Sequence, residues 1–367
     1  MQRTRSALLL FVLLWLTPAA AQHPAPRPQK VRNVVLMIGD GMGLGQVASL
    51  MIDEGYAPTS FDRAHYTAIC KTYSANNRVT DSAAAATAMA TGCKTLNSRV
   101  GMTPEGEPAV SITELARQAG LSTGIVVTSH LADATPAAFA AHVPDRHRYD
   151  GIAAQMAELR PDVMAGGGRR YFEQREDGRN LVEELRQSGY LCAATPEEFC
   201  AAERTPVAGL FSETYMPMAP DRSEAYLERA TEHTLGLLAR KGRGFFALIE
   251  GSQIDGACHQ HKTDRLSAEM RDFDRAVHCA FDFADRHPGT LVLVVADHET
   301  GGVTITSNDR DFTAAESGVE LRYSTSSHSG TPVVLYAYGA GAHHFSGVID
   351  NTDIFRLMRA LLIEGRK

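Results

Sequence analysis

Two short motifs place carboxylates and imidazoles at spacings that suit a metal ion. In the segment that runs from Glu250 to His259, Asp255 and His259 are four residues apart, so on a helical turn both reach one cation. In the other motif, Asp297 and His298 close an apolar run and precede two glycines, which let backbone approach a ligand. Each motif alone is common as a solvated Asp–His pair, so the predicted metal site depends on their combination.

A candidate nucleophile stands at the start of an alanine-rich run. Ser82 follows Asp81 and opens a stretch that is typical of a helix. A hydroxyl at a helix N-terminus lies at the positive end of the dipole, where anions bind. A hydroxyl needs a base or a metal to lose its proton, and no Gly-x-Ser-x-Gly motif surrounds Ser82. The alternative is that Asp81 or Ser82 only caps the helix.

Other polar residues complete a set with the ligands that phosphoryl transfer requires. Asp133 and Thr135 offer oxygens that suit Mg²⁺, or they cap a turn before a proline. His328 could be a third zinc ligand, and Arg146 could clamp phosphate oxygens or be merely solvated. Together the residues suit two zinc ions and one harder cation beside a serine. In-line phosphoryl transfer with a covalent serine intermediate uses such a set.

The elements that must position these residues alternate between buried strands and amphipathic helices. This alternation predicts an α/β fold, with a mostly parallel central β-sheet and helices on both faces. Asp40, Glu250 and Asp297 each follow a strand, and ligands bind at the carboxyl ends of strands in such sheets. The strands are expected at 31–38, 124–129, 163–165, 245–249, 291–296 and 333–338, and helices at 111–119, 223–240 and 264–284.

Composition and the N-terminus bound the class of protein. The 367 residues are 22% charged and 44% hydrophobic, with a net charge of −7, which is globular and gives no nucleic-acid-binding surface. Residues 1–21 carry two arginines, a ten-residue apolar run and small residues, as a signal peptide does. We therefore expect an exported protein, periplasmic or secreted, with no membrane span in the mature chain. Residues 22–30 form a Pro-rich tether, and 31–367 a single catalytic domain.

Six cysteines remain after the signal peptide. An exported protein can form disulfides, and Cys192 with Cys200 is the most plausible pair by spacing. The other cysteines are interpreted as small buried hydrophobic residues.

The sequence closely resembles the alkaline phosphatase family. Seven motifs, in family order, cover residues 31 to about 340. They are Gly39-Asp40-Gly41-Met42-Gly43, Val79-Thr80-Asp81-Ser82-Ala83, Asp133-Ala134-Thr135-Pro136, Ala165-Gly166-Gly167-Gly168, Glu250-Gly251-Ser252-Gln253-Ile254-Asp255, Asp297-His298-Glu299-Thr300-Gly301-Gly302 and His328-Ser329-Gly330.

The resemblance implies a role for each candidate residue. Ser82 becomes a phosphoserine, and Arg146 grips the phosphate oxygens. The resemblance also implies two Zn²⁺ and one Mg²⁺. The first zinc is held by Asp255, His259 and His328; the second by Asp40, Asp297 and His298; and Mg²⁺ by Thr135, Glu250 and Asp40, with Asp133 acting through water. It implies hydrolysis of small phosphate monoesters at alkaline pH, with phosphate as product, by an enzyme that could be a homodimer.

The sequence departs from the family pattern at a few positions. Gly256 stands where relatives often carry Lys, His or Trp, which leaves the identity of the third metal open. His261 is a rival ligand to His259. The short separation of His298 and His328 predicts a small cap insertion over the site, and thus an open cleft that accepts many substrates.

Other functions remain as alternatives. A phosphodiesterase of the same superfamily is disfavoured because Arg146 would occupy the space of a second ester group. A sulfatase is disfavoured because the Cys or Ser modification motif, with its following Pro and Arg, is missing around Ser82. A non-catalytic periplasmic metal- or phosphate-binding protein would not need Ser82 together with the full ligand set.

Overall fold

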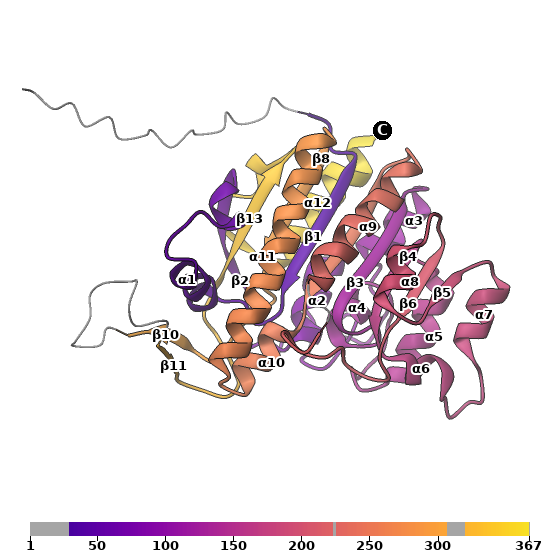
Figure 1. Cartoon of the computed structure of the whole chain (residues 1–367), viewed down its shortest axis with the longest axis horizontal. Coiled ribbons are helices and arrows are strands. Elements are labelled where there is room, and N and C mark those ends of the chain that lie inside the picture. Colours follow the sequence, from indigo (N-terminus) through magenta and orange to yellow (C-terminus); the bar gives the residue numbers. More distant parts are fainter. Residues whose placement is uncertain (1–28, 223–224, 307–319, 367) are drawn as a thin grey trace, which may run out of the picture.

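A ten-stranded sheet runs through the computed structural model, which describes residues 29–222, 225–306 and 320–366 (Figure 1). The signal peptide predicted at 1–21 and most of the 22–30 tether lie outside the described residues. The order of the strands is β14 (Gly347–Asp350), β2 (Tyr66–Lys71), β13 (Val333–Gly339), β8 (Thr290–Val295), β1 (Asn33–Gly39), β7 (Phe245–Gly251), β3 (Ser122–His130), β4 (Val163–Gly167), β6 (Val207–Leu210) and β5 (Leu191–Ala193).

The sheet is parallel except at β13, which pairs antiparallel with both β2 and β8. Every residue of β3 and β7 is buried, as expected for strands that are covered on both faces. On β7, Phe245 meets Phe283 of the helix α11, whereas the next residue, Phe246, stacks on Phe139 at the opposite face. This alternation confirms the predicted α/β class with helices on both faces.

Twelve α-helices are described, with two long ones lying across the front of the sheet in Figure 1, α9 and α11. Their bounds are α1 (Leu44–Asp53), α2 (Ser82–Thr91), α3 (Ile112–Gln118), α4 (Ala134–Ala138), α5 (Tyr149–Leu159), α6 (Arg169–Glu173), α7 (Leu181–Gln187), α8 (Pro196–Cys200), α9 (Tyr226–Arg240), α10 (Gln253–His259), α11 (Thr263–Arg286) and α12 (Asn351–Met358). None of the described helices is long and apolar enough to cross a membrane.

Two small antiparallel pairs lie between the site motifs. β9 (Glu299–Thr300) pairs with β12 (His328–Ser329), so His328 lies directly opposite Thr300. β10 (Val303–Ile305) pairs with β11 (Leu321–Tyr323), and Figure 1 shows this hairpin at one corner of the molecule, near α1. The small cap insertion was predicted in this part of the chain, and residues 307–319 within it lie outside the described ones.

The disulfide expected between Cys192 and Cys200 is not present. Both residues are free thiols, as are the four other cysteines, all of which the structure describes. The Cys192 Sγ is directed at the Val182 carbonyl of α7, at 3.7 Å, and both side chains pack against the core. They therefore act as small hydrophobic residues, which is how the other cysteines were interpreted.

Candidate active site

Three neighbouring strands deliver acidic residues to the carboxyl edge of the sheet. The register aligns Ile38 of β1 with Glu250 of β7 and with Val295 of β8. Asp40 follows β1 and Asp297 follows β8, so residues more than 200 positions apart in sequence meet at one level. The Asp40 amide donates to the Gly251 carbonyl, at 3.2 Å, which fixes the turn after β1 to the end of β7.

The first cluster joins Asp40, Asp297 and His298 beside the serine. One ligand atom of each of the three lies within 4.8 Å of the others. The Nε2 atom of His298 is 3.1 Å from Asp297 Oδ2 and 3.6 Å from Asp40 Oδ1. The same nitrogen is 3.2 Å from the Ser82 hydroxyl oxygen, so the serine belongs to this cluster.

The second cluster is built around Asp255 on α10. Its Oδ2 is 3.2 Å from Nε2 of His259, one turn later on the helix, as the four-residue spacing predicts. Its Oδ1 is 3.6 Å from Nε2 of His328, which β12 supplies. The rings of His298 and His328 stack with their centroids 3.6 Å apart, so the two clusters are contiguous.

Backbone carbonyls and a hydroxyl orient the three imidazoles. Nδ1 of His259 donates to the Ser326 carbonyl at 2.7 Å, and Nδ1 of His328 donates to the Thr80 carbonyl at 2.9 Å. The Thr300 hydroxyl donates its single proton to Asp255, at 2.5 Å, and so accepts from Nδ1 of His298, at 3.2 Å. In all three rings it is Nε2 that faces the carboxylates, so a metal ion that replaced its proton would find the arrangement of metal-binding histidines.

A third group of oxygens lies at the ends of β3 and β7. Thr135 Oγ1 and Glu250 Oε2 are buried and make no hydrogen bond, and the same holds for Asp40 Oδ1 and Asp297 Oδ2 in the first cluster. Buried polar atoms without partners are rare in proteins because they cost free energy. Cations at these positions would provide the missing partners. An all-oxygen set suits Mg²⁺, and the mixed nitrogen and oxygen sets suit Zn²⁺.

The pKa values show the same surplus of negative charge. Burial, followed by the charge of Asp297, raises the pKa of Asp40 well above its usual range. Burial also raises the pKa of Glu250, to about 8. The hydrogen bond with Asp255 raises the pKa of His259 to about 9. Burial opposes the ionisation of Asp255, but the neighbouring histidines outweigh burial and lower the pKa of Asp255. Divalent cations would relieve this crowding of carboxylates.

Ser82 is the first residue of α2, and its side chain is buried at the helix N-terminus. Asp81 is the N-cap: its side chain accepts from the Ala84 amide at 3.0 Å and from the Ser98 amide at 2.8 Å. The two roles considered for this motif, helix cap and nucleophile, therefore belong to two adjacent residues. Asp81 does the capping, and the Ser82 hydroxyl remains directed at His298.

Arg146 reaches the same cleft and is held by two carboxylates. Its Nη1 is 3.5 Å from Asp81 Oδ2, and its Nη2 is 3.3 Å from Asp133 Oδ1. Asp133 also caps α4 by accepting from the Ala134 amide at 2.8 Å, so it both caps and faces the cleft. Burial opposes ionisation of the guanidinium, but Asp133 and Asp81 outweigh it and raise the pKa of Arg146, which stays charged.

A cleft of about 530 Å³ joins these groups, and its walls include Ser82, Arg146, Asp40, Asp133 and Asp255. His259 lines this cleft, but His261 does not belong to the cluster. The His261 ring stacks on Tyr323 with the centroids 4.5 Å apart, and its Nε2 contacts the Thr325 carbonyl. The structure thus brings His259 to Asp255, and leaves its rival outside.

Among the residues of the site that were not singled out from the sequence, Thr300 and Tyr215 have the most direct contacts with predicted site residues. Thr300 joins Asp255 to His298, and Tyr215 lies in the cleft wall next to Asp133. Thr300 stands in the Asp297–Gly302 motif, so its position was a signal that could have identified it. Tyr215 stands in no motif, and only the tertiary structure reveals it.

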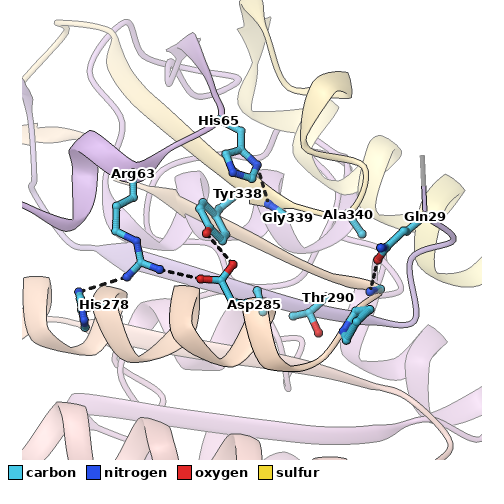
Figure 2. Close-up of a pocket in the computed structure, with 12 residues that line it drawn as sticks. Gln29, Arg63, His65, His278, Asp285, Thr290, Tyr338, Gly339 and Ala340 are labelled. Carbon is cyan, nitrogen blue, oxygen red and sulfur yellow. Dashed lines mark hydrogen bonds and ion pairs between the residues drawn. The ribbon is translucent and has the colours of Figure 1, made fainter. Parts of the chain in front are cut away.

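A second cavity of similar size, about 520 Å³, lies at the opposite, amino-terminal edge of β1 and β8 (Figure 2). Arg63 donates there to Asp282 and Asp285, at 2.8 and 2.9 Å, and the Tyr338 hydroxyl donates to Asp285 at 2.7 Å. No predicted site residue lines this cavity.

Comparisons with known proteins agree with this geometry. The family model of alkaline phosphatase matches residues 31–319. Alkaline phosphatase 4 of Bacillus subtilis (strain 168) is 31% identical over 92% of this chain and 90% of its own length. Streptomycin-6-phosphate phosphatase of Streptomyces griseus is 34% identical over 97% of this chain and 96% of its own length.

A solved structure is similar over almost its whole length. Alkaline phosphatase from the Antarctic bacterium TAB5 has a TM-score of 0.85 and 32% identity, covering 91% of this chain and 98% of that chain. A His-to-Asp variant of the TAB5 enzyme is described with Mg bound in its M3 site. The match over most of the chain, together with the fold and the clustered ligands, shows that this chain belongs to the alkaline phosphatase family of metal-dependent phosphomonoesterases.

Proposed function

We propose that the enzyme hydrolyses phosphate monoesters through a phosphoserine at Ser82, with two Zn²⁺ and one Mg²⁺. The observation that carries the proposal is the position of the Ser82 hydroxyl, 3.2 Å from Nε2 of His298 and beside carboxylate atoms that lack partners. The first zinc would be held by Asp255, His259 and His328, the second by Asp40, Asp297 and His298, and Mg²⁺ by Asp40, Thr135 and Glu250, with Asp133 nearby. The His-to-Asp variant of the TAB5 enzyme, described with Mg in its M3 site, supports a magnesium beside an aspartate in this fold.

When bound, the ions would supply positive charge that favours the serine alkoxide and offsets the negative charge of the phosphoryl and leaving oxygens. The chain's own residues do the remaining work. The dipole of α2 favours the alkoxide at Ser82, because this residue opens the helix. Arg146 can bind two non-bridging oxygens through its fork, since Asp81 and Asp133 hold the guanidinium in the cleft.

The Ser82 oxygen then forms a bond to phosphorus while the bond from phosphorus to the ester oxygen breaks on the opposite side, in line. The ester oxygen takes up a proton and leaves as the alcohol. Water hydrolyses the phosphoserine in a second displacement that releases inorganic phosphate and restores the hydroxyl. Holding nucleophile and phosphate in one cleft is what makes both displacements fast. A second ester group would compete with Arg146 for space, so monoesters are preferred over diesters.

An acid quench of the enzyme with a ³²P-labelled monoester tests the intermediate. We expect label on the peptide that contains Ser82, and none in the Ser82→Ala variant. Ser327→Ala is the matched control, because Ser327 is an exposed serine beside His328. Undiminished phosphate release by Ser82→Ala would refute the nucleophile, and faster hydrolysis of bis(p-nitrophenyl) phosphate than of the monoester would favour a diesterase.

Elemental analysis of two variants tests the ligand assignment. Loss of His259 in the variant His259→Ala should reduce bound zinc from two towards one per chain, because a ligand is missing. His261→Ala should keep two, because that ring stacks on Tyr323. The reverse pattern would reassign the ligand.

Export, the signal peptide at 1–21, the single domain over 31–367 and the homodimer remain predictions from the sequence and the resemblance. Mass spectrometry of the secreted or periplasmic protein would test the cleavage after Ala21, and sedimentation would test the dimer.

A further inference from the structure

One wall of the active-site cleft is made of apolar side chains from a single segment. Residues 212–219 follow β6 and precede α9, and three of them, Tyr215, Met216 and Met218, line the cleft that also contains Ser82 and Arg146. Tyr215 is 47% exposed, whereas Met216 is buried. None of these three residues takes part in the proposed ligand set or in the displacement at phosphorus.

The wall is fixed at both ends by hydrogen bonds. The Ser212 carbonyl accepts from the amides of Gly168 and Arg169, at 3.0 and 2.9 Å. The Met216 carbonyl accepts from Gln253 Nε2 at 2.8 Å, which ties the segment to α10, the helix of Asp255 and His259. A wall tied to the site in this way is preformed and loses little freedom when a substrate binds.

The Tyr215 ring is held by neighbours and is partly exposed at the cleft. The ring of His130, which is completely buried, contacts Tyr215 nearly perpendicularly, at 72° and a centroid distance of 4.6 Å. The hydroxyl end of Tyr215 lies beside the Asp133 carboxylate. An aromatic ring that is held in place and partly exposed at a cleft can pack against another ring, face to face or edge to face.

Met218 continues this surface to the second cluster, which is built around Asp255. A Cβ atom at Gly256 would lie 2.7 Å from Cε of Met218, so the thioether occupies the space that a larger residue would need. Gly256 directly follows Asp255. Next to Gly256, this chain therefore presents a polarizable, adaptable sulfur-containing side chain to the cleft.

From these contacts we propose that Tyr215 and Met218 form a subsite for the leaving group, which favours phosphomonoesters of aromatic alcohols over those of small aliphatic alcohols. The inference rests on the proposed function. With the phosphate between Ser82 and Arg146, the organic group must leave along the same cleft, where this wall is its apolar neighbour. The cleft stays open to other monoesters, and the wall adds a preference among them.

The test compares kcat/KM for 1-naphthyl phosphate and for ethyl phosphate in each variant, relative to the wild type. Using the same two substrates throughout cancels their different intrinsic reactivities. Tyr215→Ala should lower the value for naphthyl phosphate by about three- to tenfold more than that for ethyl phosphate, mainly through KM. Met218→Ala should do the same to a smaller extent, and Met218→Leu should retain most of the preference.

Tyr215→Phe is the matched control, since it keeps the ring and removes the hydroxyl beside Asp133. Both substrates should then change by the same factor. An equal loss on both substrates in Tyr215→Ala, with no change in preference in Met218→Ala, would overturn the subsite and make Tyr215 only a positioning residue for Asp133. Failure of the wild type to release phosphate from either ester would instead overturn the proposed function.

Discussion

Two cavities of nearly equal size lie at opposite edges of the sheet, and their charges are arranged differently. At the carboxyl edge, where Asp40 lines the cleft, buried oxygens of Asp40, Glu250 and Asp297 make no hydrogen bond, and Asp40 and Asp297 share one imidazole, that of His298, at ion-pair distance. In the cavity at the amino edge, Arg63 is paired with Asp282 and Asp285. Size therefore does not distinguish the functional cavity. An excess of buried, unpaired negative charge does, because it is costly unless cations bind there.

Of the changes that test this difference between the cavities, removal of metal should have the largest effect on activity. Exhaustive chelation should lower phosphate release by at least about 10³-fold, because the carboxylates then repel the phosphate. Zinc and magnesium together should restore it, as measured by phosphate release beside elemental analysis. Full activity in a protein without bound metal would contradict a metal-binding role for the acidic cluster.

Substitution of an arginine in each cavity should separate function from stability. Arg146→Ala should lower kcat/KM for a monoester by about 10²- to 10³-fold, because the bound phosphate loses its charged clamp. Arg63→Ala should leave kcat/KM unchanged and lower the free energy of unfolding by ~1 kcal/mol. Arg146→Lys, which keeps the charge without the fork, should recover only part of the activity. Equal kinetic losses at both positions would contradict the distinction.

The stability of the metal-free protein should fall as pH rises from 5 to 9. The pKa of Glu250 is raised to about 8, so the folded state holds a proton that the unfolded chain releases near pH 4.5. The pKa of His259 is raised to about 9, and its stabilising charge is likewise lost as pH rises from 6.5 through 9. We expect a loss of several kcal/mol in urea unfolding, with the larger share from the fully buried Glu250 and the smaller from the partly exposed His259. The metal-loaded protein should lack this loss, since metal binding strengthens as its ligands deprotonate.

The smallest effects should come from neutralising one acid in each cavity. In the chelated protein at pH 9, Glu250→Gln should raise the free energy of unfolding by ~1–2 kcal/mol, because it removes an unpaired buried charge. Asp285→Asn should lower it by ~0.5–1 kcal/mol, because it weakens the pair with Arg63. Phosphate release should fall for Glu250→Gln, the variant that gains stability, and should not fall for Asp285→Asn. Thermal melts of the chelated samples, and phosphate release by the same variants loaded with metal, would reveal any exception.

The central part of the fold could be predicted from the sequence. β1, β3, β4, β7, β8 and β13 lie where continuous apolar runs predict strands, because strands covered on both faces leave no polar alternation. The capping box at Ser111 and Glu114 correctly marks the start of α3. The strands β2, β5, β6 and β14 were not predicted. They are short or lie near the edges, and β2 alternates buried and exposed residues.

The sequence by itself determined which chemistry is available: a serine that opens a helix, an Asp–His pair one turn apart, and acids that end buried strands. Only the tertiary structure decided which of these groups meet. It placed His259 rather than His261 on Asp255, used Thr300 to join the two clusters, and brought Tyr215 and Met218 into the cleft. The physical reason is that spacing along the chain fixes neighbours only within an element. Contacts between elements depend on sheet register and on the packing of loops that carry no local signal.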